Sequence, residues 1–138
     1  MNPSVGILTI GDELLNGSLV DSNSAVIADR LARIGLVVQE SRTLPDSAPA
    51  IVTGIRQMTA ACDILIITGG LGPTKDDLTS ACVARAFRQS CTLNQTALKL
   101  IDDYCRKRGR PPHRRDRKSA EFPTGAPNIR TGYFSRIG

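Results

Sequence analysis

Four consecutive aliphatic residues, Ile64–Ile67, constrain the fold of this chain more than any other feature of its sequence. The run lies between Asp63 and Thr68 and has no polar face. Such continuous runs are typical of strands in a parallel sheet that helices cover on both sides. We therefore expect Asp63–Thr68 to be the central strand of such a sheet. The run is far too short to span a bilayer, so we expect no membrane segment.

Strand and helix patterns alternate on both sides of this run. Ser4–Ile10 predicts a short buried strand and Leu36–Glu40 a second one. Apolar residues at helical spacing predict four helices: after Asp21–Asn23 and ending at Gly35, after Pro45–Ser47, from Asp77 through Phe87, and after Asn94. A chain of 138 residues has the size of one ordinary domain. The alternation predicts an α/β fold, a three-layer sandwich with a mostly parallel sheet.

No regular pattern follows Gly109, and we expect a loop or a disordered tail there. The segment from Arg106 to Lys118 holds eight basic residues and one acid, a net charge of +7, which leaves −2 for the remainder of a chain with +5 in total. Basic runs are usually solvated surface. This one lacks interleaved aromatic side chains for base stacking, so nucleic acid is not an expected partner, although the segment keeps that alternative open.

The cysteines and the N-terminus indicate a cytoplasmic protein. The first residues lack the charged start and the cleavage site of a secretory signal. None of the four cysteines forms a C-x-x-C pair, and the one histidine, His113, does not complete a zinc site. We expect the cysteines to be reduced. The sequence leaves a homo-oligomer open.

The loop after the predicted central strand carries the strongest signal for a binding site. It reads Thr68-Gly69-Gly70-Leu71-Gly72-Pro73-Thr74-Lys75-Asp76-Asp77. Its glycines let backbone N–H groups approach an anion, its two threonines add hydroxyls, and Lys75 adds a cation. The N-terminus of the following helix also favours negative charge, so we expect a phosphate here. The spacing fits neither a Walker A motif nor a dinucleotide fingerprint, and a tight turn with Asp77 as helix cap is the alternative.

Acidic residues accompany this loop. Asp76 and Asp77 would repel a phosphate, unless one of them holds Mg²⁺ or a similar hard cation that bridges to it. Asp12 and Glu13 leave the first predicted strand at its carboxyl end, the edge where parallel sheets bind ligands. They are either solvated loop acids or a metal-ligand and general-base pair facing the glycine loop. No Ser-His-Asp set can be assembled, because His113 lies in the basic segment.

Two motifs together resemble a known family. They are Gly11-Asp12-Glu13-Leu14-Leu15-x-Gly17 with Asp21-Ser22-Asn23, and the segment from Thr68 to Thr79. Both are similar to the N-terminal domain of the competence/damage-inducible protein CinA, within the molybdopterin-binding superfamily of molybdenum cofactor biosynthesis. A further match covers Arg117–Ala126, whereas Pro127–Gly138 looks unrelated. We interpret residues 1–126 as an incomplete domain of this kind and residues 127–138 as a divergent tail.

The resemblance implies a MogA-like three-layer α/β fold that lacks C-terminal strands. It implies a nucleotide or pterin-phosphate ligand and metal-dependent hydrolysis of the pyrophosphate of ADP-ribose or a similar nucleoside diphosphate sugar. The alternative is molybdopterin or nucleotide binding without turnover. Carried onto this sequence, it assigns catalysis to Asp12, Glu13 and Asp77, a divalent metal to Asp76 and Asp77, and ligand binding to Gly11, Asn23, Thr68, Gly69, Gly70, Gly72, Pro73, Thr74 and Thr79. For Asn23, a helix-cap or turn role is the alternative.

Overall fold

The computed structural model describes residues 2–72, 74–75 and 77–129. The chain divides into two compact units, Met1–Gly70 and Leu71–Gly138, and each is described by itself. No helix in the described ranges is long and apolar enough to cross a membrane.

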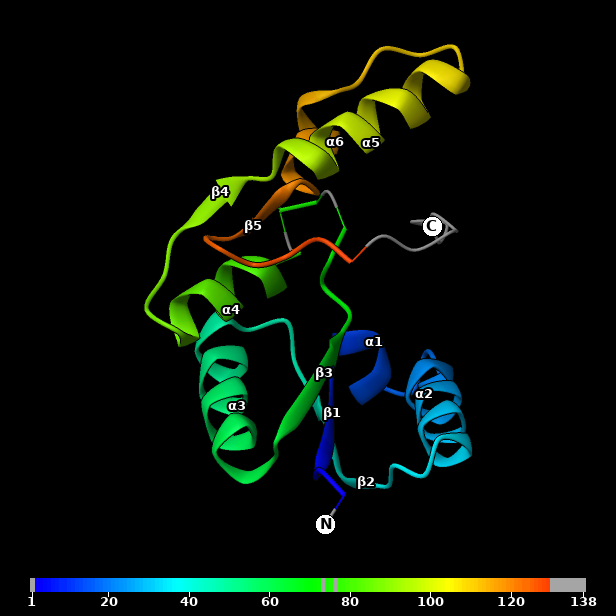
Figure 1. The fold of residues 1–138 in the computed structure, drawn as a ribbon, viewed down its shortest axis with the longest axis vertical. Coiled ribbons are helices and arrows are strands. Elements are labelled where there is room, and N and C mark those ends of the chain that lie inside the picture. The colour runs from blue at the N-terminus through cyan, green and yellow to red at the C-terminus, as the bar shows by residue number, and fades with distance from the viewer. Residues whose placement is uncertain (1, 73, 76, 130–138) are drawn as a thin grey trace. The chain divides into compact units, whose positions relative to one another are not determined.

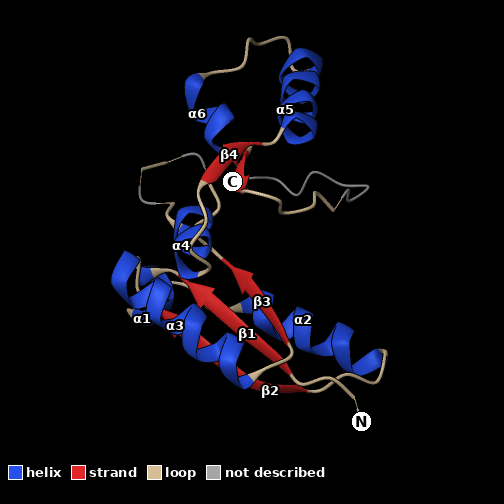
Figure 2. Cartoon of the chain, turned by 60° about the vertical axis from the view of Figure 1, so that its left-hand side comes forward, coloured by secondary structure: helices blue, strands red, loops and turns tan. Residues whose placement is uncertain are grey.

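The first unit is built on a three-stranded parallel sheet (Figure 1). Its strands are, in spatial order, β2 (Val38–Leu44), β1 (Val5–Ile10) and β3 (Ile64–Thr68). Helix α3 (Ala48–Ala61) covers one face of this sheet and α2 (Ser22–Arg33) the other, as Figure 2 shows from another side. The predicted α/β fold with a parallel sheet between two helical layers is therefore confirmed in this unit.

Side chains of β1 alternate between the two helical layers. A Cβ atom on Gly6 would lie 2.9 Å from Cys62 Sγ and 3.0 Å from Met58 Cε, so this face of β1 packs against α3. Thr9 faces the other way, and its hydroxyl donates to Asp21 Oδ2 at the start of α2 over 2.9 Å. The core of the unit consists of buried aliphatic residues from β1 and α3: Val5, Ile7, Leu8, Ile10, Ile51, Val52, Ile55 and Met58.

The central strand of this sheet is β1, and the prediction that Asp63–Thr68 is central was wrong. Within the described residues β3 pairs with β1 on one edge only. Ile64 of β3 is 39% exposed, whereas Ile7 and Leu8 of β1 are at most 1% exposed. A strand paired on both edges and covered on both faces loses nearly all of its accessible surface. An aliphatic run indicates burial between two layers, but it carries no information about the position of the strand in the sheet.

Two other boundaries in this unit differ from the predictions. Leu36–Glu40 was predicted as the second strand, whereas β2 begins at Val38 and continues to Leu44. Its polar residues lie at the edge of the sheet, where exposed and partly buried side chains alternate, so an apolar pattern does not reveal them. The residues after Gly11 were predicted as a loop, but Asp12–Leu15 form the short helix α1. Gly35 follows α2 with φ 81°, as expected for a glycine that ends a helix.

The second unit contains three helices and a two-stranded antiparallel sheet among its described residues. In chain order the elements are α4 (Thr79–Ala86), β4 (Cys91–Leu93), α5 (Gln95–Lys107), α6 (Arg114–Lys118) and β5 (Glu121–Pro123). Helix α4 begins two residues later than predicted. Asn94 caps α5 as predicted, since its side chain accepts from the backbone N–H of Ala97 over 2.9 Å.

The prediction of a loop or disordered tail after Gly109 was wrong for Arg114–Lys118 and for Glu121–Pro123. Helix α6 and strand β5 occupy part of this segment, and β5 pairs with β4 in the register Thr92↔Phe122. Asp116 stabilises α6, because its carboxylate accepts from the backbone N–H of His113 over 2.7 Å and from the guanidinium of Arg110. Neither element has the apolar periodicity that would indicate it in the sequence: α6 is five charged residues and β5 has three residues.

Candidate functional site

Both predicted site loops begin at the same edge of the parallel sheet. Thr9 of β1 lies opposite Thr68 of β3, so the residues that follow the two strands are neighbours. At Gly69 the backbone has φ 85°, and a Cβ atom there would lie only 2.0 Å from the carbonyl oxygen of Ile10. The structure therefore brings the Gly11–Glu13 segment together with the start of the glycine-rich loop, Thr68–Gly70, within the first unit.

Three carboxylates lie close to this edge. Asp12 and Glu13 are exposed in α1, directly after the end of β1. The backbone N–H of Asp12 donates to Asp46 Oδ2 over 3.0 Å, and the backbone N–H of Asp46 donates to Asp12 Oδ1 over 3.2 Å. From the sequence, Asp46 was predicted only as part of a helix start. Asp46 follows the carboxyl end of β2, just as Asp12 follows that of β1. A predicted second strand that ended at Leu44 would have placed Asp46 at this edge of the sheet.

The other predicted site residues of the first unit differ in burial and in hydrogen bonding. Gly11 is buried, and its N–H donates to Leu44 O over 3.0 Å. The hydroxyl oxygen of Thr68 is buried and has no hydrogen-bond partner among the described residues. Asn23 is exposed in the first turn of α2, whose N-cap is Asp21. Burial raises the pKa of the Asp21 carboxyl, but hydrogen bonds from Ser24, Thr9 and Asn23 together hold that pKa below its ordinary value.

In the second unit, Asp77 organises the end of the glycine-rich loop. Its Oδ2 accepts from the backbone N–H of Thr74 over 2.8 Å and from the Thr74 hydroxyl over 2.5 Å, and its carboxylate also accepts from the backbone N–H of Gly72. A Cβ atom on Gly72 would lie 2.7 Å from Asp77 Oδ2, so a larger residue there would displace the Asp77 carboxylate. Burial raises the pKa of Asp77, but these hydrogen bonds and the charge of Lys118 bring it below the ordinary value. The donors of Gly72 and Thr74 that were predicted to bind phosphate contact Asp77 in this structure.

Lys118 contacts the same turn from the end of α6. Its ammonium donates to the carbonyl oxygens of Thr74 and Asp77, the second over 2.8 Å. From the sequence, Lys118 was predicted to lie in the basic segment and in the family match Arg117–Ala126, and neither indicated this contact. Lys75 is exposed. The predicted site residues Pro73 and Asp76 lie outside the described residues.

The start of α4 offers backbone donors next to this loop. Its N-cap is Leu78, which has no side-chain acceptor and makes no side-chain cap hydrogen bond. A polar N-cap would satisfy the N–H groups of the second and third helical residues, here Ser80 and Ala81. Thr79, the first helical residue, is 2% exposed. The N-cap side chain therefore does not compete with an anion for the first-turn amides of α4.

The described residues do not by themselves form a metal site. They contain no group of three histidine, cysteine, aspartate or glutamate side chains placed to hold a metal ion. Asp12 and Asp46 lie together as a pair, and the carboxylate of Asp77 already accepts three hydrogen bonds from its own loop.

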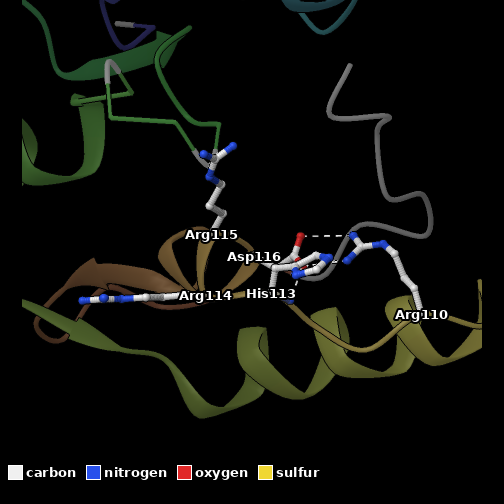
Figure 3. Close-up of a pocket in the computed structure, with 5 residues that line it drawn as sticks. All are labelled: Arg110, His113, Arg114, Arg115 and Asp116. Atoms are coloured by element: carbon white, nitrogen blue, oxygen red, sulfur yellow. Dashed lines mark hydrogen bonds and ion pairs between the residues drawn. The ribbon is translucent and has the colours of Figure 1, made fainter.

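The basic segment surrounds an open hollow of about 500 Å³ in the second unit. Arg110 is fixed there by two contacts to Asp116, of 2.7 and 3.1 Å, and this pairing, with the N–H of His113, lowers the pKa of Asp116 to about 2. Arg114 and Arg115 point in different directions and away from Asp116 (Figure 3). Since these cations do not converge on one point, the hollow fits a solvated surface better than a binding site.

Comparison with known sequences identifies the family. Residues 6–132 match the sequence model of a family described as a probable molybdopterin binding domain. The chain belongs to this family. It is also 42% identical over 123 residues to a CinA-like protein of Syntrophotalea carbinolica, covering 89% of this chain and 30% of that protein. A CinA-like protein of Citrifermentans bemidjiense is 40% identical over 140 residues, with 97% and 34% covered. The chain thus spans about a third of these curated relatives.

Solved structures agree with this assignment. The CinA protein of Thermoplasma acidophilum, described as having unknown function, has a TM-score of 0.78 at 29% identity, over 88% of this chain and 70% of that one. The molybdopterin biosynthesis enzyme MoaB of Thermus thermophilus has a TM-score of 0.58 at 23% identity, over 73% and 63%, which shows a common fold. The predicted resemblance to the CinA N-terminal domain is therefore confirmed.

Proposed function

We propose that this molybdopterin-binding-family domain binds the phosphate end of a nucleotide or a pterin phosphate at the glycine-rich loop, Thr68–Thr79. The observation that carries the proposal is the start of α4, whose N-cap residue, Leu78, makes no side-chain hydrogen bond to the first turn of the helix. Positive helix-end dipoles and unsatisfied N–H groups together attract phosphate. The family description and the exposed Lys75 support the same class of ligand.

A proline substitution at the second position of α4 tests this site. Ser80→Pro removes one amide donor, and a proline in the first turn is compatible with a helix, as Pro49 in α3 illustrates. We expect ten- to hundredfold weaker binding of ADP-ribose or AMP by calorimetry, because a hydrogen bond to a charged group contributes about 1.5–3 kcal/mol. Thr96→Pro, at the same position of α5, is the matched control and should bind like the wild type. Equal affinities in the two variants would refute the site.

A second proposal is metal-dependent hydrolysis of the pyrophosphate of ADP-ribose or a similar nucleoside diphosphate sugar. The exposed carboxylates of Asp12 and Glu13, with Asp46 beside Asp12 at the carboxyl edge of the sheet, favour it over binding alone. Because the described residues do not complete a metal site, we assign no reaction step to a cation. In this proposal Asp12 or Glu13 accepts the proton of the attacking water, and the products are AMP and ribose 5-phosphate.

Thermal melts separate the two proposals. ADP-ribose, ATP and AMP are each added with Mg²⁺ or with EDTA, since a ligand that binds only the folded state raises the midpoint by mass action. A midpoint that rises in EDTA, without AMP release in Mg²⁺, supports binding without turnover. AMP release in Mg²⁺ that Asp12→Asn and Glu13→Gln together abolish supports hydrolysis. Midpoints that no compound moves under either condition argue against both.

Two further expectations belong to the same proposal. The four cysteines are free, which fits a reducing compartment, and we propose that the protein is cytoplasmic. We also propose that it acts on a small molecule rather than on nucleic acid, since Arg114 and Arg115 diverge on an open surface.

A further inference from the structure

Lys118 is partly buried, and among the described cations of the basic segment it is distinguished by hydrogen bonds to a distant part of the chain. Its ammonium donates to the carbonyl oxygens of Thr74 and Asp77, which lie 44 and 41 positions earlier in the sequence. By contrast Lys107, the last residue of α5, is exposed. A flexible lysine side chain loses rotamer entropy when it is fixed, so a held lysine indicates a compensating interaction.

The two carbonyl groups belong to the two ends of one turn. Inside that turn, the Asp77 carboxylate accepts from the N–H and the hydroxyl of Thr74, and the N–H of Asp77 lies 3.4 Å from the carbonyl oxygen of Thr74. Two sets of contacts therefore hold the turn: Lys118 donates to its two carbonyl oxygens, and the Asp77 carboxylate accepts from Thr74. An ammonium has three donors and no acceptor, which suits a site made of carbonyl oxygens.

The same contact changes the charge that a ligand meets at this loop. Asp77 is ionised at neutral pH and would repel a phosphate, the difficulty that a bridging metal was expected to remove. The ammonium of Lys118 lies beside the Asp77 backbone and offsets this charge. Its hydrogen bonds also hold two carbonyl oxygens, which would repel an anion, on the side of α6.

We propose that Lys118 is a positioning residue for the phosphate loop, which fixes the Thr74–Asp77 turn through its two carbonyl groups and allows an anion to bind there without a metal. The inference rests on the proposed phosphate binding. It extends that proposal with two predictions. Phosphate binding at the loop depends on the distant residue Lys118, and this dependence persists in EDTA.

The test compares Lys118→Met with Lys107→Met, the same change at the last residue of the neighbouring helix. Binding of ADP-ribose and of inorganic pyrophosphate is measured by calorimetry in EDTA. Hydrogen exchange of the Thr74 and Asp77 amides is measured without any ligand. For Lys118→Met we expect at least tenfold weaker binding and at least tenfold faster exchange, whereas Lys107→Met should match the wild type. Lys118→Arg keeps the charge and the donors, and should restore most of both properties.

The outcomes separate this inference from the proposed function. If the wild type binds neither compound, phosphate binding fails, and the exchange of the two amides still decides whether Lys118 holds the turn. Unchanged exchange in Lys118→Met, or unchanged affinity in EDTA, would overturn the inference. If Lys118→Met does not melt cooperatively, Lys118→Gln, which keeps a polar N–H donor without the positive charge, replaces it in both measurements.

Discussion

At Gly69 the backbone runs so close to Ile10 that no side chain fits between them. A Cβ atom would lie 2.0 Å from the Ile10 carbonyl oxygen, and the residue has φ 85°. Gly35 has a similar φ of 81°, but a Cβ atom there meets nothing within 4 Å. An alanine at Gly35 would therefore have only the conformational cost of a positive φ. An alanine at Gly69 would have that cost and a steric clash as well.

We expect Gly69→Ala to lower the free energy of unfolding by about 2–4 kcal/mol, because the alanine combines a left-handed backbone with a clash against backbone atoms that cannot move away cheaply. Gly35→Ala, with the backbone term alone, should cost about 1 kcal/mol. Urea unfolding followed by circular dichroism measures both values. Equal losses in the two variants would contradict the close approach of β1 and β3 at this point.

Single residues also show where sequence interpretation reaches its limit. The glycine-rich loop could be identified in the sequence, because its combination of glycines, threonines and a lysine favours anion binding. Whether the donors of Gly72 and Thr74 face a ligand or the chain itself depends on the position of the Asp77 carboxylate, which spacing does not determine. The contact of Lys118 depends on a turn more than forty residues away, and no local pattern records it.

Among the elements, those with a repeating apolar pattern could be predicted and those without one could not. Helices α2, α3 and α5 were predicted because apolar residues recur along one side, and β1 because it is buried throughout. Strands β4 and β5 have three residues each and depend on pairing with one another. Helix α6 has no apolar residue and depends on Asp116, which joins its first turn to Arg110.

The contribution of Asp116 to α6 should depend on pH. The guanidinium of Arg110 and the N–H of His113 lower its pKa to about 2, against an ordinary value of 3.8. A carboxyl with a depressed pKa in the folded state stabilises that state above pH 4, and this stabilisation is lost as the pH falls towards 2. An NMR titration of the Asp116 carboxyl carbon should show a midpoint near 2 in the wild type.

Two arginine substitutions identify the cause of this shift. Arg110→Gln removes the bidentate partner and should return the pKa of Asp116 most of the way towards 3.8. Arg114→Gln is the control, because its side chain points away from Asp116 (Figure 3). A wild-type midpoint near 4, or the same midpoint in both variants, would mean that Arg110 does not hold the start of α6.

At the scale of the whole molecule, the large buried side chains gather in one of the two units. The core of Met1–Gly70 contains isoleucine, leucine, valine and methionine from β1 and α3. Among the described residues of the second unit, the buried apolar ones are small: Cys82, Ala84, Ala97, Cys105 and Ala120. Burying a large aliphatic side chain contributes about 1.5–3 kcal/mol, whereas an alanine contributes much less. The first unit therefore has the larger share of the hydrophobic stabilisation.

This distribution predicts that the second unit opens before the first. In native-state hydrogen exchange at low denaturant, amides of Ile7 and Leu8 in β1 should exchange only through the largest opening reaction, and amides of α5 around Ala97 through a smaller one that costs less free energy. Ile55→Ala should lower the exchange free energy of β1 by about 2–5 kcal/mol, as expected for a truncated core residue, and leave that of α5 nearly unchanged. If both sets of amides instead shared one exchange free energy and Ile55→Ala lowered both equally, the two units would unfold as a single cooperative structure.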